Sequence, residues 1–516
     1  MQTTSTTFQN YASGQVRPLS IQFRMSFDKA YDDTVEFFTL DQSILDGPDL
    51  LQTNDPVPMQ AWNFYDYKNY TDRIISAEWS REIDFPYSVS SALADVKLNN
   101  YDNYFSPNSG SPIQNYIIPK RPMRILSGFK NEVIPQFVGL TEKIPTIDDE
   151  SKIVTFHATD FLSEMFTLNT TKLLTMQNVR TDQVLEAIFD QFGLSSSMYD
   201  LDEGANIIPF LFYEKGTATA TIFNSLMEAE MGNLWLDEAG IIRFSNRYQA
   251  QSSPTFTFDE SSIVSISVPD KDNIINKVKI TSKIRELQEE QSIWNMAENS
   301  GSELIIKANS TAVYDVSLDN PCVAVINPTI GQSTTTSWFT AIKTLDDSAV
   351  TTDISVTGQS LKTNTITFFF ANDNNFEVNV NAMELWGEPA KIVDVIDYEE
   401  EMPNSIAKYG ERLLEIKNDF IQSISQCQSL AIPILLYMSE YANTIDIEVK
   451  SQPAIQLNDA IEIYYAPYSG VYRVQKIVNQ ISNKKYTQKI TCSKYASLNI
   501  FTLDESILDG TDVLDI

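Results

Sequence analysis

Hydrophobic and polar residues alternate along many short stretches of this chain. In residues 19–27 every second side chain is apolar, which predicts a half-buried strand. Between residues 73 and 160, further short apolar runs are separated by Asn-Asp, Pro-Asn and Ser-Gly pairs, which favour turns. Short strands with frequent turns are typical of a barrel or a sandwich. We therefore expect a first β-barrel at residues 18–160, preceded by a polar arm, flexible or docked, at residues 1–17.

After residue 160 the spacing of apolar residues becomes helical. Residues 181–194 predict a helix whose start is capped by Thr181 or Asp182 and which ends at Gly193. Residues 219–232 predict a second helix, again ended by a glycine. Two strands around an Asp-Glu-Ala-Gly turn follow directly, with Gly240 supplying a positive φ. These elements predict a small α+β unit at residues 161–270.

The second part of the chain is more mixed. Residues 285–298 are acidic and fit a helix after a strand, whereas residues 301–393 are rich in Thr, Ser, Asn and Val and predict an inserted β-sandwich. Helices are expected at residues 404–420 and 423–442, the latter kinked or shortened by a proline. Strands return afterwards. We expect a second β-barrel with helices, built from residues 271–300 together with 394–500.

Composition supports a mostly β chain of several domains. The 516 residues include 28 Phe, 23 Tyr and 6 Trp, and aromatic residues favour strands. The formal net charge is −32, which argues against tight binding of duplex DNA. An acidic wall repels phosphates, so DNA would slide past it instead of adhering to it.

The cysteine spacing and the short length of the apolar runs indicate the compartment in which the chain folds. Cys322, Cys427 and Cys492 are far apart and form no C-x-x-C pair, so neither a disulfide framework nor a zinc site is expected. The first residues lack the basic and apolar regions of a signal peptide, and no run approaches about 20 apolar residues. Folding in a reducing compartment is the expectation.

Residues for catalysis are scarce. His157 is the one histidine, and it alternates with apolar residues on an expected strand, which favours a structural role. The chain has no G-x-S-x-G elbow, no H-E-x-x-H and no glycine-rich phosphate loop. Paired carboxylates of a glycosidase remain possible in principle, but 69 acidic residues make any pair uninformative. We expect no enzyme, no catalytic residue, no cofactor and no metal.

Residues 61–73 interleave aromatic and polar side chains. Such a run can stack on sugar rings, and more often it is an edge strand or loop whose rings close over a core.

One short segment occurs twice. Residues 38–51 and 501–514 are identical at eleven of fourteen positions. A calcium loop is excluded, because taking Gly47 as its sixth position leaves Gln42 and Ile44 where acids are required. The expected structure is a turn capped by aspartates, with buried apolar residues. We interpret the copies, at 38–51 and in the terminal segment 501–516, as docking motifs with these candidate residues: Phe38, Leu40, Asp41, Ile44, Leu45, Asp46, Gly47, Asp49, Leu51, Phe501, Leu503, Asp504, Ile507, Leu508, Asp509, Gly510, Asp512 and Leu514.

Three regions together resemble a known family. Segments within residues 94–162 are similar to the first barrel of phage tail-tip hub proteins, and segments within residues 181–247 to their helical middle domain with its hairpin. Segments within residues 405–465 are similar to their second barrel region. The resemblance covers residues 70–250 and 395–495, and leaves the insert at 301–393 uncovered.

The resemblance implies a baseplate hub. In that family two similar β-barrels per chain form a pseudo-sixfold ring in a homotrimer, which adapts a sixfold tail tube or distal tail protein ring to a threefold tip. It implies a spike or fibre protein below, and a lumen through which the tape measure protein and DNA pass. It also implies a location in the virion, at the tail tip, after assembly in the host bacterial cytoplasm. Two copies of the repeated segment in each of three chains would then give six contacts with a sixfold ring.

Two other functions stay open from the sequence. A carbohydrate-binding receptor module would use the insert and the aromatic run. A cell-wall hydrolase would use a pair of the many carboxylates.

Overall fold

The computed structural model describes most of the chain. The described residues are 1–14, 17–27, 67–107, 109–168, 176–213, 217–248, 253–269, 274–298, 304–328, 338–362, 365–439, 444–482 and 485–494.

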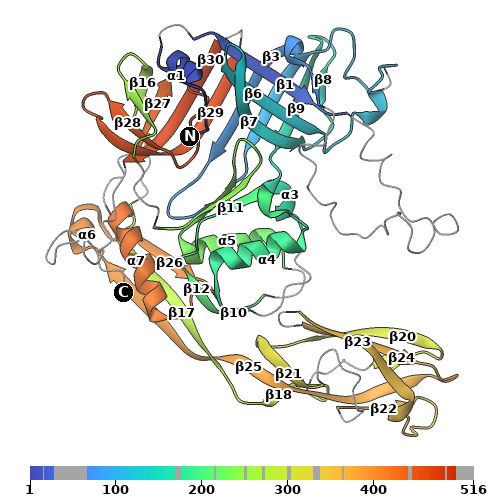
Figure 1. Ribbon diagram of the computed structural model, residues 1–516. Helices are drawn as coiled ribbons and strands as arrows, with labels where there is room; N and C mark the ends of the chain where they lie inside the picture. Colours follow the sequence, from blue (N-terminus) through green and yellow to red (C-terminus); the bar gives the residue numbers. More distant parts are fainter. Residues whose placement is uncertain are drawn as a thin grey trace.

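The protein is mostly β, and its largest sheet contains 14 strands. Two groups of strands lie side by side in it, across the top of Figure 1. The first sheet half consists of β1 (Leu19–Met25), β2 (Lys68–Asn69), β3 (Ile74–Glu82), β5 (Leu93–Asn99), β6 (Pro122–Phe129), β7 (Glu132–Thr141), β8 (Thr146–Asp148) and β9 (Ile153–Thr159). The second sheet half consists of β15 (Phe256–Asp259), β16 (Ile263–Ser267), β27 (Thr444–Val449), β28 (Ala460–Tyr464), β29 (Gly470–Ser482) and β30 (Lys485–Lys494).

The two sheet halves share one strand order. In space the first half runs β3-β5-β9-β7-β6-β1, and the second runs β16-β27-β30-β29-β28-β15. If the six main strands of each half are numbered along the chain, both spatial orders read second, third, sixth, fifth, fourth, first. One pairing differs, because β1 is antiparallel to β6 whereas β15 is parallel to β28. The chain therefore contains the same topology twice.

Alternation explains why each half buries one face. In β5 the burial pattern alternates along the whole strand, with Ala94, Val96 and Leu98 inside. These side chains join a core with Phe23, Phe137 and Phe156 in the first half. A separate core fills the second half, around Ile447, Ile461, Val474 and Ile490. The opposite face of each half carries mainly polar residues, as period-two alternation requires.

The expectation of β-barrels is wrong, because no sheet in the described part of the chain closes on itself. In the first half the outer edge of β3 is occupied by β29, and β1 at the far end pairs with the two-residue β2. In the second half the end strands β15 and β16 pair with β28 and β27, not with each other. Each half is a curved, open sheet, and pairing between the halves replaces closure.

The middle unit lies below the large sheet in Figure 1. Its elements are α3 (Leu162–Phe166), β10 (Met176–Arg180), α4 (Thr181–Gln191), β11 (Tyr199–Leu201), β12 (Ile207–Leu211), α5 (Thr219–Glu230), β13 (Asn233–Leu236) and β14 (Ile242–Ser245), with β4 (Ser88–Val89) pairing to β13. The two predicted helices and the hairpin are confirmed. Gly193 ends α4 with φ +71°, and Gly240 has φ +89° in the hairpin turn.

The residues that cap α4 at its start and end α5 differ from the predicted ones. Helix α4 is capped at Arg180, because the Thr181 hydroxyl donates to Glu230 and the Asp182 carboxylate accepts from the Gly204 N–H. Helix α5 is ended by Met231 in the left-handed conformation. The next residue, Gly232, is required for another reason: a Cβ there would lie 2.7 Å from the Ser245 carbonyl oxygen.

An arm extends from the middle unit. It contains β17 (Lys277–Leu287), β25 (Val378–Glu401), β26 (Leu413–Lys417), α6 (Pro403–Tyr409) and α7 (Ile424–Met438). The helix expected at 404–420 is wrong beyond Tyr409, because Gly410 has φ +77° and the chain continues as β26 beside β17. The acidic helix expected at 285–298 is also wrong, since these residues belong to strands that pair with β25. Helix α7 contains Pro433 and buries one side in the core of the middle unit.

The distal end of the arm is a β-sandwich, drawn at the lower right of Figure 1. Its strands are β18 (Gln291–Asn295), β19 (Leu304–Ile306), β20 (Ser310–Ser317), β21 (Cys322–Asn327), β22 (Phe339–Lys343), β23 (Ile354–Lys362) and β24 (Thr365–Asn372), together with the start of β25. A sheet around β25 and the sheet β20-β24-β23 enclose one core that includes Trp338 and Phe368. The sequence pattern grouped residues 271–300 with the second barrel. The strands in this range, β17 and β18, pair instead with β25 of the arm.

The N-terminal arm is docked. Helix α1 (Thr6–Ser13) buries Phe8 and Ala12, and the Phe8 ring lies 4.9 Å from that of Phe129. Its core also includes Ala454 of the second half. The arm therefore bridges the two sheet halves.

Candidate functional site

The candidate site is the seam where the two sheet halves join. Strand β3 pairs antiparallel with β29 from Ser76 opposite Ser482 to Glu82 opposite Lys476. On the outward face, a carboxylate oxygen of Glu82 lies 2.5 Å from Nζ of Lys476. Backbone pairing makes one continuous surface of the two halves, and the ion pair marks its midline.

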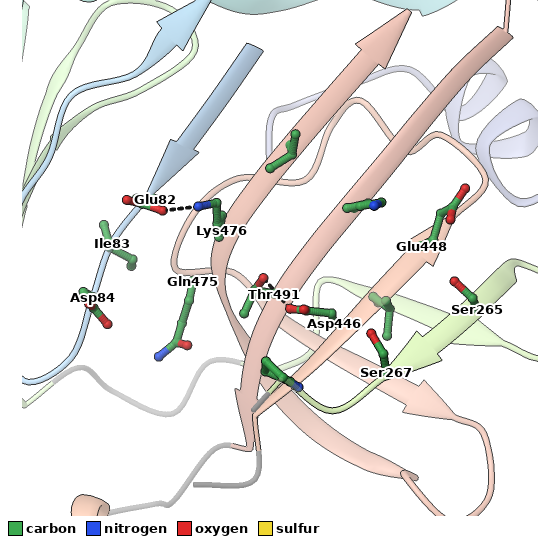
Figure 2. A pocket seen from close by; sticks show the side chains of 14 residues that line it. Glu82, Ile83, Asp84, Ser265, Ser267, Asp446, Glu448, Gln475, Lys476 and Thr491 are labelled. Atoms are coloured by element: carbon green, nitrogen blue, oxygen red, sulfur yellow. Dashed lines mark hydrogen bonds and ion pairs between the residues drawn. The ribbon is translucent and has the colours of Figure 1, made fainter. Parts of the chain in front are cut away.

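A hollow of about 520 Å³ lies on this surface beside the seam (Figure 2). Its lining comes from the end of β3 and from β29, β30, β27 and β16, so both halves contribute. Figure 2 shows the Glu82–Lys476 pair on one side and the hydroxyl of Thr491, which donates to Asp446 at 2.6 Å, on the other. The hollow thus depends on the junction of the halves.

Charges of both signs line the hollow. Glu82, Asp84, Asp446 and Glu448 are acidic, whereas Lys476 and Lys489 are basic, and the remaining lining includes serines and a glutamine. None of these side chains is a histidine or a cysteine. This composition suits a hydrated wall, because paired and solvated charges hold water at the surface without a strong site for one ligand.

A buried ion pair lies behind the seam. Arg81 of β3 contacts Glu238 of the β13–β14 turn, with exposed side-chain fractions of 7% and 4%. Arg81 also donates to the carbonyl of Gln136 on β7, and Gln456 of the second half donates to Glu238 at 2.7 Å. One charged cluster therefore connects the first half, the middle unit and the second half.

Another buried acid lies at the end of β9. Asp160 is 1% exposed and accepts a hydrogen bond from the Ala92 N–H at 2.6 Å. Burial raises its pKa to about 7, although that hydrogen bond favours the charged form. The acid lies in the packed interior, where it stabilises the start of the middle unit and not an open site.

His157 has a structural partner. It lies on β9 directly opposite Asp95 of β5, and its Nδ1 is 2.5 Å from the Asp95 carboxylate. The pair stands on the polar face of the first half and stabilises two adjacent strands. Neither residue is part of the seam.

The three cysteines are buried and form no disulfide. Burial raises the pKa of the Cys427 thiol to about 11 and that of Cys322 to about 11, and raises the pKa of Cys492 as well. Raised thiol pKa values indicate unreactive thiols, because the thiolate is the nucleophile.

The described ranges contain neither a metal-binding cluster nor a membrane-spanning helix. In that part of the chain, no group of three or more His, Cys, Asp or Glu residues is arranged to hold a metal ion. Among its helices none has the length and apolar content needed to cross a membrane.

The repeated segment lies outside the described residues in both copies, including Phe38 to Leu51 and Phe501 to Leu514. Its docking role stays a prediction. The chain order does show where the copies fall. The first is inserted between the first and second strands of the first half, and the second follows the sixth strand of the second half. The copies therefore do not occupy corresponding places in the two halves.

The local sequence pattern does not indicate which residues form the seam. Glu82, Arg81 and Lys476 lie on ordinary alternating strands. The local sequence predicts the turn that contains Glu238, but it indicates no partner for this side chain. The alternation does indicate that Glu82 and Lys476 face solvent, but their partnership depends on which strands become neighbours.

Comparison with known proteins gives structural neighbours only. No family model matches the sequence, and no curated protein matches it. The structure is similar to the 43 kDa tail protein of prophage MuSo2 from Shewanella oneidensis, with 9% identity, 83% of this chain and 95% of that chain covered, and a TM-score of 0.45. It is similar to the tail protein from Neisseria meningitidis MC58, with 7% identity, coverage of 92% and 96%, and a TM-score of 0.45. It is also similar to prophage tail protein gp18 from Listeria monocytogenes EGD-e, with 12% identity, coverage of 83% and 91%, and a TM-score of 0.41.

Proposed function

We propose that the protein is a structural component of a bacteriophage tail tip, the baseplate hub. In this proposal three copies form a ring that adapts a sixfold tail tube or distal tail protein ring to a threefold tip. The ring lines the channel through which the tape measure protein and DNA pass. Its place is the tail tip of the virion, after assembly in the host bacterial cytoplasm.

The duplicated strand order is the observation that carries this proposal. One chain holds two sheet halves of the same topology, joined directly by pairing of β3 with β29. Three such chains supply six similar units, and six units match a sixfold partner while keeping threefold symmetry of the whole chain.

The polar face of the large sheet supports a channel wall. The apolar face of each half packs on its own core, and the opposite face beside the seam is lined mainly by polar and charged residues. The whole chain has a net charge of −32, and a negative wall repels phosphates. DNA would therefore pass without being held.

The arm supplies a second contact region in this proposal. Strands β17 and β25 carry the sandwich away from the large sheet (Figure 1). A spike or fibre protein would bind on this distal side, and the tail tube would bind the ring.

Mass measurement tests the proposal. Native mass spectrometry of the full chain, alone and with its tail partners, should give a complex of three copies, and electron microscopy of assembled tails should place threefold density at the tip. A chain that stays monomeric with its partners present would overturn the proposal.

The repeated segment is proposed as a docking element for the ring partner. Deleting residues 501–516 should leave trimers intact and reduce their attachment to the tail. Normal attachment of the shortened chain would show that the docking role is wrong.

A further inference from the structure

Helix α7 exposes a row of apolar side chains on its outer side. Its inner side packs in the core of the middle unit. On the outer side Ile424, Ile432 and Leu436 are 41%, 37% and 44% exposed. Together with the exposed Gln428 they follow one another at intervals of four residues, so they form one ridge along the helix. We call these four residues the α7 ridge. Exposed apolar side chains gathered in one row are typical of an interaction surface.

The ridge has an unusual charge for this protein. Helix α7 contains no charged side chain, although the whole chain has a net charge of −32. A segment that is both apolar and acidic is repelled by acidic surfaces, and a ridge without acids does not repel it. The terminal copy of the repeated segment, residues 501–514, has this composition. It contains no lysine or arginine, and its acidic residues are Asp504, Glu505, Asp509 and Asp512, with apolar residues Phe501, Leu503, Ile507, Leu508, Val513 and Leu514.

The path of the chain leads from β30 towards this helix. Strand β27 pairs with β30 so that Thr444 lies opposite Ser493. Helix α7 ends at Met438 with Ser439 as its cap, a few residues before Thr444. In Figure 1, α7 lies below the second sheet half on the same side of the molecule. The chain therefore leaves β30 beside the strand that follows α7.

Chain lengths permit the contact. Ser439 and Thr444 are five residues apart in sequence, which spans at most about 17 Å, and Thr444 and Ser493 are separated by about 5 Å across the sheet. From Ser493 the chain reaches Phe501 in eight residues, which span up to about 27 Å. The terminal copy can therefore begin at the end of α7 that carries Leu436. The ridge is about 18 Å long, and fourteen residues cover about 21 Å even as a helix.

We propose that the α7 ridge binds the terminal copy of the same chain. The apolar side chains of the copy cover the ridge, and its acids stay in water. The contact lies within one chain, so it goes beyond the proposed function and requires neither a ring nor a tail partner. A tail partner that binds this copy competes with α7 for it. The other copy, residues 38–51, is attached to the first sheet half between β1 and β2 and does not share this path.

Thiol labelling tests the contact in the full-length chain. Gln428→Cys places a thiol in the middle of the ridge, and the three native cysteines are buried with raised thiol pKa values. The native thiols should therefore react slowly with a maleimide, because the thiolate is the nucleophile. We would compare the labelling rate of the variant with and without residues 501–516. The deletion should raise this rate at least about tenfold, because the copy no longer covers the thiol.

A matched control places the new thiol elsewhere. Thr311→Cys, at an exposed position of β20 in the distal sandwich, should be labelled at the same rate with and without residues 501–516. Equal rates for Gln428→Cys in both chains would overturn the proposal: fast labelling in both would show an open ridge, and slow labelling in both would show that another segment covers it. The rate in the full chain should not change on dilution. Faster labelling on dilution would assign the copy to a second chain and would also overturn the proposal.

A peptide supplies a second measurement. A fluorescent peptide of residues 501–516 should bind the chain that lacks these residues, one peptide to each chain, as measured by fluorescence anisotropy. Ile432→Glu together with Leu436→Glu should weaken this binding at least about tenfold, because two acids then face an acidic peptide. Both side chains are partly exposed, so the thermal unfolding of the variant checks that it folds.

The control for the peptide measurement adds the same charge at another site. Ile305→Glu together with Val313→Glu changes two side chains of the distal sandwich that are 52% and 62% exposed, and it should leave peptide binding unaltered. Absence of saturable binding, or equal binding by the ridge variant and this control, would overturn the proposal.

Failure of this inference differs from failure of the proposed function. An open ridge in a chain that forms trimers would leave the proposed ring in place and show that this contact is wrong. A covered ridge in a chain that stays monomeric with its tail partners would support this contact and show that the ring is wrong.

Discussion

Arg81 on β3 and Glu238 in the β13–β14 turn form a buried ion pair between the first sheet half and the middle unit. Gln456 donates to the same carboxylate from the second half. Three parts of the chain that are distant in sequence therefore meet at one acid. Removing one partner of such a pair leaves a charge without compensation in a low-dielectric interior.

Glu238→Gln should destabilise the protein strongly. The amide keeps the size of the side chain but leaves the Arg81 guanidinium unpaired, at a cost of about 3–5 kcal/mol in the free energy of unfolding. Urea denaturation followed by tryptophan fluorescence would measure the loss.

Two controls belong with that variant. Glu82→Gln breaks the exposed pair with Lys476 and should cost about 1 kcal/mol or less. Arg81→Met combined with Glu238→Gln should recover part of the lost stability, since neither charge of this pair remains buried. A loss in Glu238→Gln no larger than in Glu82→Gln would contradict the role given to the buried pair.

Stability should depend on the ionisation of Asp160. Its pKa is raised from 3.8 to about 7 in the folded protein by burial. Between about pH 4 and pH 7 the folded chain retains a proton that the unfolded chain has released, so the free energy of unfolding falls as pH rises through this window. Above pH 7 the loss is complete, on the order of 4 kcal/mol.

Asp160→Asn should abolish this dependence. The amide oxygen still accepts from the Ala92 N–H, and the side chain no longer ionises. Urea midpoints at pH 5 and pH 8 would be compared for both proteins. A wild-type midpoint that does not fall relative to the variant between these values would rule out the raised pKa.

The docked N-terminal helix should contribute measurably to the joint between the halves. Phe8→Ala removes a ring that is 1% exposed and packs on Phe129, and such changes cost about 3–5 kcal/mol. Asn10→Ala, at an exposed position of the same helix, is the matched control and should be nearly neutral. Differential scanning calorimetry would show a lower melting temperature for Phe8→Ala alone if the helix is docked as described.

The distal sandwich should unfold as a unit of its own, because its core is separate from the other cores. Phe368 and Phe369 are adjacent on β24 and differ in burial, at 0% and 40% exposed. Phe368→Ala should destabilise the sandwich by about 3–5 kcal/mol, and Phe369→Ala by clearly less. Hydrogen exchange should report faster exchange in residues 304–385 for Phe368→Ala, with the large sheet unchanged. Equal effects of the two variants, or faster exchange throughout the chain, would contradict a separate core.

Local sequence patterns predicted correctly those elements whose conformation depends mainly on their own residues. The helices α4 and α5 and the hairpin with Gly240 follow from apolar spacing and glycine punctuation, and strand β1 follows from strict alternation. Local patterns failed at residues 404–420, where helical spacing continues through Gly410 although the chain turns there and becomes β26 beside β17. Pairing with an existing strand satisfies the backbone of these residues, and that partner is invisible in the local sequence.

The sequence by itself determined helices α4 and α5, strand β1 and the apolar face of alternating strands such as β5, and it showed that histidine and cysteine are few. The tertiary structure decided how the strands become neighbours. Two barrels were expected, and two open halves of one topology were found, because the outer edge of β3 pairs with β29, a strand almost four hundred residues further along the chain. Edge pairing uses backbone groups that every residue carries, so it leaves no mark in side-chain patterns. The seam and its ion pairs are consequences of that choice of neighbours.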